Sequence, residues 1–231
     1  MLVLIGGARR AVGVLIVACL TLVACSSSTP TTTVATPAPG GAMELDLDQG
    51  ATDITVRAAD VGADLYRVSV NPESGQTPKV TRSGATVHVG LQQSGSGDGP
   101  SSLQIDLDPH VRWVLRLNGG AHIENVDMSG GRLAELDLLA GATRCDLRLG
   151  PAQGVVRVRF TGGATELYVH LPGGGAAHIT LVVAIPSVRI DGSQLPVGRP
   201  AQEIAVGDAS AADRYVVDVA AGVSTLTVDH G

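Results

Sequence analysis

Leu136-Asp137-Leu138-Leu139-Ala140-Gly141-Ala142-Thr143-Arg144-Cys145-Asp146-Leu147 places apolar residues at alternate positions on both sides of a Gly-Ala pair. Alternation with a period of two is typical of β-strands, because successive side chains point to opposite faces of a sheet. The stretch therefore predicts two short strands that share one buried face. Gly141-Ala142 marks the corner between them.

The same pattern occurs in five copies along the chain. The small-residue pairs that mark them are Gly50-Ala51, Gly120-Ala121, Gly141-Ala142, Gly163-Ala164 and Gly222-Val223. The second copy is looser after its glycine, with Ile123 and Val126 as its apolar residues. A short repeat of this kind indicates a solenoid, whose units bury their apolar faces only against their neighbours. We expect each glycine to allow a corner with positive φ, and the small residue beside it to let the next coil stack closely.

Stacking in register makes specific predictions for the central coils. Leu117, Leu138 and Phe160 should lie one above another in the core. On the outside, two ladders of alternating charge should form, Arg116-Asp137-Arg159 and Asp127-Arg148-His170. Opposite charges on neighbouring strands contribute about 0.2–1 kcal/mol each, so these side chains are expected to hold the stack together.

Further strands are predicted outside the five copies. They cover Tyr66 to Val70, Thr86 to Leu91, Leu103 to Leu107, Ala177 to Val183 and Val188 to Ile190. The Gly/Ser-rich segment Gln92 to Ser102 is predicted to be an exposed loop, and Leu195 to Asp213 to be mostly irregular with one helical turn. Residues 43–231 should thus form an all-β domain, a right-handed single-stranded β-helix, with a β-sandwich as the alternative.

The N-terminal segment has the features of an export signal. Arg9-Arg10 precede the apolar stretch Ala11 to Ala24, which is too short to span a bilayer comfortably. Leu22-Val23-Ala24-Cys25 resembles the bacterial lipobox, which implies cleavage before Cys25 and lipidation of its thiol. We therefore expect a signal peptide over residues 1–24, a lipidated Cys25 with a Ser/Thr/Pro tether over 25–42, and an extracytoplasmic protein anchored to the cell membrane. The alternative is an ordinary signal peptide or membrane anchor in which the cysteine is incidental.

Composition and motifs give little evidence for nucleic-acid binding, metal binding or catalysis. With 22 acidic and 16 basic residues the chain has a net charge of −6, which argues against nucleic acid as a partner. The acidic pairs Asp46/Asp48 and Asp106/Asp108 suit Ca²⁺ or acid–base catalysis, but they alternate with aliphatic residues as on the solvent face of a strand. The six histidines lack paired metal-ligand spacing, so we expect no metal ion and no other cofactor. Cys145 occupies an inward position and is expected to be a buried, inert thiol.

One aromatic side chain is a candidate for surface contact. Tyr168 is predicted to face outward between Glu166 and His170, and such a ring beside polar groups favours contact with a glycan or a protein. In the alternative interpretation, the ring covers the neighbouring coil. Trp113 is expected to pack at the entrance to the central coils. No serine-nucleophile elbow or phosphate-binding loop occurs, so no catalytic residue is assigned.

The run from Trp113 to Gly192 carries a family resemblance. It contains Gly119-Gly120-Ala121, Leu136-Asp137-Leu138, Gly162-Gly163-Ala164 and Leu171-Pro172. It resembles the putative-adhesin and toast-rack domains of bacterial envelope proteins, which are similar to the cell-wall-active-antibiotic response proteins. The resemblance implies an all-β domain without established catalytic residues.

These observations together suggest a non-enzymatic, lipid-anchored envelope protein with an adhesin-like binding surface. Its partner would be a cell-wall polymer or another envelope protein. Two alternatives stay open: a sensory or regulatory lipoprotein of envelope stress, and a β-helix enzyme that acts on polysaccharide. The enzyme would need a cluster of carboxylates or basic residues in a groove, and acidic residues in register on three coils would favour it.

Overall fold

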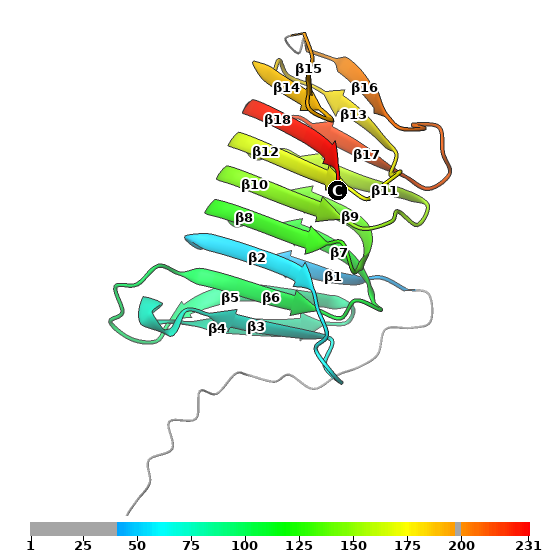
Figure 1. Cartoon of the computed structure of the whole chain (residues 1–231). Helices are drawn as coiled ribbons and strands as arrows, with labels where there is room; N and C mark the ends of the chain where they lie inside the picture. The colour runs from blue at the N-terminus through cyan, green and yellow to red at the C-terminus, as the bar shows by residue number, and fades with distance from the viewer. Residues whose placement is uncertain (1–40, 197–199) are drawn as a thin grey trace, which may run out of the picture.

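The strands of the described residues are divided equally between two nine-stranded sheets (Figure 1). The computed structural model describes residues 41–196 and 200–231. In spatial order, sheet A consists of β16 (Gln202–Val206), β13 (Ala177–Leu181), β17 (Arg214–Val219), β11 (Val155–Phe160), β9 (Arg132–Leu138), β7 (Arg112–Leu117), β1 (Met43–Leu47), β5 (Thr86–Gln93) and β4 (Gln76–Ser83). Sheet B consists of β15 (Ser193–Gln194), β14 (Ser187–Ile190), β18 (Val223–His230), β12 (Ala164–Leu171), β10 (Ala142–Leu149), β8 (Ala121–Met128), β2 (Asp53–Ala58), β6 (Ser102–Leu107) and β3 (Tyr66–Val70).

The central chain segment steps back and forth between the sheets. Strands β7, β9 and β11 lie in sheet A, β8, β10 and β12 lie in sheet B, and neighbours within each sheet pair in parallel. The register places Leu117 opposite Leu138 and Leu138 opposite Phe160, so the predicted column of core residues is confirmed. Each strand pair of a repeat copy therefore contributes one strand to each sheet.

The first and last copies of the repeat lie inside the stack rather than at its ends. β1 is inserted between β5 and β7, and β17 is inserted between β11 and β13. Figure 1 shows the same for sheet B, where the red strand β18 lies between β12 and β14. Both terminal coils thus have hydrogen-bonding partners on either edge, which the order of the copies in the sequence did not predict.

Antiparallel strands close the two ends of the stack. β4 and β3 pair antiparallel with β5 and β6 at one end, and β16 and β15 do so with β13 and β14 at the other. The edge strand β4 contains Pro78 and Lys79, the only lysine of the chain. Proline and lysine on an edge strand discourage pairing with another chain.

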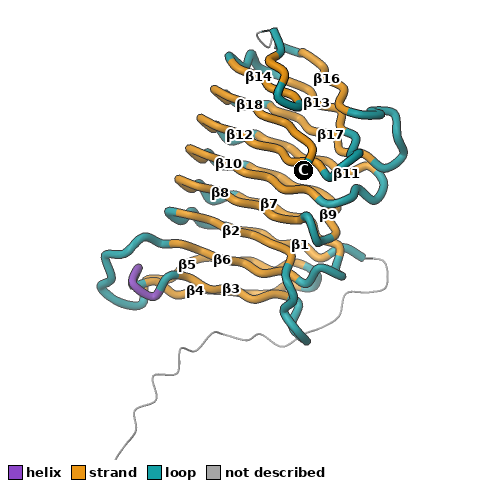
Figure 2. Tube along the Cα trace, viewed as in Figure 1, coloured by secondary structure: helices purple, strands orange, loops and turns teal. Residues whose placement is uncertain are grey.

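One prediction for the second of these ends was wrong. The segment Leu195 to Asp213 is predicted to be mostly irregular with one helical turn; its described residues, 195–196 and 200–213, contain strand β16 and no helix. The strand signal is weak because only Ile204 and Val206 point into the core. Figure 2 shows the one helical turn of the described residues, the 3₁₀ helix Pro72–Ser74, near the other end of the stack.

A single apolar core fills the space between the sheets. Alternate residues point inward, so that Met43, Leu45 and Leu47 on β1 are fully buried. Trp113 is also fully buried, as expected, and its Nε1–H donates to the carbonyl oxygen of Asp108 at 3.0 Å. Burial of each aliphatic side chain contributes about 1.5–3 kcal/mol, so the core is the main stabilising element of the fold.

The repeat glycines do not have the positive φ predicted for the corners. None of the five lies at positive φ. A Cβ added to Gly50 would instead lie 2.4 Å from the carbonyl oxygen of Gly120, and one added to Gly120 would lie 2.9 Å from that of Gly141. Gly50 and Gly120 therefore serve close stacking: the backbone of the neighbouring repeat copy approaches each of them so closely that a Cβ does not fit without a shift.

The predicted all-β class is confirmed. The layout of the two mixed sheets is compatible with the β-sandwich alternative. The predicted signal peptide, the lipidation site Cys25 and most of the tether lie outside the described residues. No helix in residues 41–196 and 200–231 is long and apolar enough to cross a membrane.

Candidate functional site

The outer face of sheet A carries a network of paired charges. The register aligns Arg116, Asp137 and Arg159, so this predicted ladder is confirmed. Arg116 Nη1 lies 2.8 Å from Asp137 Oδ2, and Arg159 Nε lies 2.8 Å from Asp137 Oδ1. Arg116 also pairs with Glu44, and Arg159 with Glu135 at 2.8 Å. Because the Asp137 side chain is only 1% exposed, its charge depends on both guanidinium groups.

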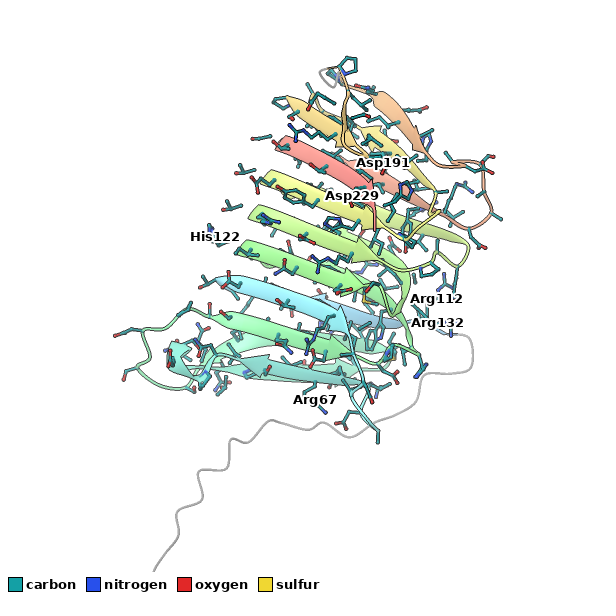
Figure 3. The ribbon with its side chains drawn as sticks, in the orientation of Figure 1. Arg67, Arg112, His122, Arg132, Asp191 and Asp229 are labelled. Carbon is teal, nitrogen blue, oxygen red and sulfur yellow. The ribbon has the colours of Figure 1, made fainter. Side chains whose placement is uncertain are left out.

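The second ladder lies on the outer face of sheet B. The register aligns Asp127, Arg148 and His170 as predicted. Arg148 nevertheless contacts Asp146 of its own strand, with 3.7 Å from Nε to Oδ1. His170 pairs across strands instead, with Nδ1 at 2.6 Å from Asp229 Oδ1. Figure 3 shows Asp229 on this face toward the end of β18.

The predicted contact residues Glu166, Tyr168 and His170 lie in a row along β12. Tyr168 is half-buried, and its hydroxyl lies 3.4 Å from Glu166 Oε2. The rings of Tyr168 and His170 are parallel, with centroids 6.4 Å apart. The guanidinium of Arg144 on β10 lies 4.4 Å from the Tyr168 ring centre, a cation–π contact. The ring is thus held by its neighbours within a row of polar and aromatic groups.

A second cluster joins residues that are far apart in the sequence. Asp46 lies on the outer side of β1 and Asp48 directly after that strand, and the parallel pairing of β1 with β5 places His88 opposite Asp46. His88 Nδ1 lies 3.5 Å from Asp46 Oδ2 and 3.8 Å from Asp48 Oδ2. One ligand atom from each residue lies within 4.8 Å of the others, a spacing suited to a metal ion. Sequence spacing missed this cluster because His88 is on a different strand from the two carboxylates.

The cluster borders a groove of about 420 Å³ at the β4 end of sheet A. The groove is lined by polar side chains together with parts of β5: Asp48, Gln49, Lys79, Thr81, His88, Gly90, Leu91, Gln92 and Gln93. Partial burial, with a further contribution from Asp48, raises the pKa of Asp46 above its ordinary value. The groove is thus a concave polar surface in which the Asp48 carboxylate lies beside the His88 imidazole, with Asp46 next to it.

The other predicted candidates have structural partners. Asp106 accepts a hydrogen bond from Arg57 Nε at 2.6 Å, and Asp108 Oδ1 accepts one from the backbone N–H of His110 at 2.8 Å. Cys145 is fully buried as expected, and burial raises the pKa of its thiol well above the ordinary value. His122 lies at the edge where β8 begins (Figure 3), with Nδ1 at 3.1 Å from Thr143 Oγ1.

Sequence reasoning missed a carboxyl group inside the core. Glu124 on β8 is 1% exposed, and its Oε1 has no hydrogen-bond partner. Burial raises the pKa of Glu124 to about 8. Its position gives a usable signal, because it lies four residues after Gly120, where other copies have the apolar residues Ile54, Cys145, Leu167 and Leu226. Ile123, expected to point inward in this copy, is only half-buried on the opposite face of the strand.

Comparison with known proteins gives a structural neighbour. No family model and no curated protein matches the sequence. A crystal structure of a "putative cell adhesion protein" from Clostridium sporogenes aligns with a TM-score of 0.59 and 16% sequence identity. The alignment covers 82% of this chain and 93% of that chain. At this identity the likeness shows a shared fold, which extends over nearly the whole of the neighbour.

Proposed function

We propose that this protein is a lipid-anchored, non-enzymatic binding protein of the cell envelope. The observation that carries the proposal is the shared fold with a putative cell adhesion protein over 93% of that chain. The lipobox-like Leu22-Val23-Ala24-Cys25 and the Ser/Thr/Pro tether support an extracytoplasmic position on the cell membrane. The stacked strand pairs, taken as the coils of a right-handed β-helix, would supply a rigid body behind the binding face.

The register of sheet A favours this function over polysaccharide cleavage. A carbohydrate-cleaving β-helix needs acidic side chains gathered on one face. Along the central row of sheet A, however, Asp46, Arg116, Asp137 and Arg159 alternate in sign. Alternating charges neutralise one another across strands, so their main effect is to stabilise the stack.

The row Glu166, Tyr168 and His170 on β12 is the proposed contact surface. It offers a carboxylate, a half-buried aromatic ring and an imidazole along one strand of sheet B. The side chain of His170 is 25% exposed and that of Glu166 is 43% exposed, so both present polar atoms to solvent. A cell-wall polymer or an envelope protein is the class of partner that such a row of amphipathic and polar groups suits.

A binding experiment with isolated cell fractions tests the proposal. The full chain, purified in detergent, is mixed with cell-wall and membrane fractions of the producing organism, and the bound amount is measured after sedimentation. We expect saturable binding that Tyr168→Ala weakens. Arg67→Ala is the matched control, because Arg67 is exposed at the opposite end of sheet B (Figure 3). Absence of saturable binding to either fraction would contradict the binding function, and equal losses in both variants would contradict the assigned surface.

A further inference from the structure

The cluster of Asp46, Asp48 and His88 has the residue types and spacing of a metal site. A zinc ion binds imidazole nitrogen and carboxylate oxygen at about 2.0–2.2 Å, so two ligand atoms of a tetrahedral site lie about 3.4 Å apart. The distances from His88 Nδ1 to the nearest carboxylate oxygens of Asp46 and Asp48 are 3.5 and 3.8 Å. Small side-chain rotations would therefore bring all three groups to bonding distance of one ion.

A hydrogen bond from outside the three proposed ligands orients the Asp46 carboxylate. Asn118, at the end of β7, donates from Nδ2 to Asp46 Oδ1. This bond fixes the carboxylate and leaves the other oxygen, Oδ2, toward His88. Carboxylate and imidazole ligands of metal sites are generally oriented by such outer hydrogen bonds. On the other side, the parallel pairing of β1 with β5 places His88 directly opposite Asp46.

The local charge also favours a cation. Glu44 and Asp46 lie on the outer side of β1, and Asp48 follows directly after the last residue of the strand. The neighbouring guanidinium of Arg116 is paired with Glu44 and Asp137. His88 Nδ1 faces both aspartates, at 3.5 Å from Asp46 Oδ2 and 3.8 Å from Asp48 Oδ2. A divalent ion would neutralise the pair while using the imidazole as a ligand.

We propose that Asp46, Asp48 and His88 bind a divalent transition-metal ion of the zinc class. Calcium and magnesium fit less well, because they prefer sites made of oxygen ligands, whereas imidazole suits zinc and its neighbours. Three protein ligands leave coordination positions open toward the polar groove beside Asp48 and His88. The site lies on sheet A, apart from the proposed contact row on sheet B, and does not depend on it.

Titration with zinc alone tests the proposal. The full chain in detergent is treated with a chelator, freed of it, and titrated with Zn²⁺ near neutral pH by isothermal calorimetry. We expect one ion per chain, and a loss of affinity of about tenfold or more in both Asp46→Asn and His88→Gln. A large excess of Ca²⁺ or Mg²⁺ should not displace the zinc. Co²⁺ bound at the site should show strengthened visible absorption bands in the wild type that His88→Gln lacks.

His178→Gln is the matched control, because His178 lies on the outer face of the same sheet beside a single carboxylate, Glu203, at 3.9 Å. It should bind zinc like the wild type. Absence of zinc binding, full affinity in His88→Gln, an equal loss in His178→Gln, or displacement by Ca²⁺ would each overturn the proposal. Trp113 fluorescence checks that each variant is folded. If Asp46→Asn does not fold, Asp48→Asn is measured instead, since the Asp48 side chain is 53% exposed and its substitution disturbs the fold less.

Discussion

The buried carboxyl of Glu124 should make the protein less stable as the pH rises. In the unfolded chain the Glu124 carboxyl ionises near its ordinary pKa of 4.5, whereas burial in the folded protein raises the pKa of this carboxyl to about 8. The folded state therefore keeps a proton that the unfolded state releases. The carboxyl does not lower the free energy of unfolding below about pH 4.5, and between the two pKa values it lowers that free energy by about 1.4 kcal/mol per pH unit.

The same values give the size of the effect at neutral pH. At pH 7 the difference between the two states amounts to about 3 kcal/mol, and it reaches its full value above pH 8. Glu124→Gln keeps the shape of the protonated side chain but cannot ionise. The variant should therefore match the wild type near pH 4 and exceed its free energy of unfolding by about 3 kcal/mol at pH 7.

Urea unfolding followed by fluorescence provides the assay, because Trp113 is the only tryptophan and is fully buried. The free energy of unfolding is measured for both proteins from pH 4 to above pH 8. Glu166→Gln is the control, since that exposed carboxyl on the outer face of sheet B should shift stability by no more than about 0.5 kcal/mol. A difference between Glu124→Gln and the wild type that does not change with pH would refute the reasoning.

Three further predictions concern the paired charges, the histidines and the thiol. Replacing both Arg116 and Arg159 by leucine should lower the free energy of unfolding by about 3 kcal/mol or more, which exceeds the sum of the two single changes, because Asp137 then keeps a buried charge without a partner. Additive effects of the two substitutions in a double-mutant cycle would contradict this. The carbonyl oxygen of Gly175 and the carboxylate of Asp191 raise the pKa of His230, so NMR titration should give a value above 6.5, and Asp191→Asn should lower it. The pairing of His230 with Asp191 stabilises the fold fully below pH 6.5 and progressively less as the pH rises through the pKa of His230 in the folded protein. A measured pKa of His230 that is not above 6.5 would contradict this. Cys145 should react with a thiol reagent only at the rate of unfolding, and rapid labelling of the native protein would contradict its burial.

The sequence predicted the strands of the central repeat copies well because their signal is local and repeated. Leu117, Leu138 and Phe160 follow their strands at fixed offsets from a glycine, so their alignment follows from the repeat alone. The same holds for the charge ladder of Arg116, Asp137 and Arg159. These features need only short-range periodicity and parallel stacking.

The features that were missed depend on contacts between distant segments. The insertion of β1 between β5 and β7 is decided by pairing across the stack, which the periodicity within one copy does not encode. The same insertion brings His88 beside Asp46 and so creates the proposed metal site. The reason for the glycines was also nonlocal, since the close approach that excludes a side chain from Gly50 comes from Gly120, in a coil distant in sequence.

Comparing two alanine substitutions at equivalent repeat glycines tests the stacked-coil account most directly. A Cβ at Gly50 would meet the Gly120 backbone at 2.4 Å, whereas one at Gly222 meets no atom within 4 Å. Stacking predicts that Gly50→Ala loses about 1–3 kcal/mol of unfolding free energy, as overpacked sites do. Gly222→Ala should change stability by no more than about 0.5–1 kcal/mol, in the stabilising direction. Equal effects of the two substitutions would contradict the account.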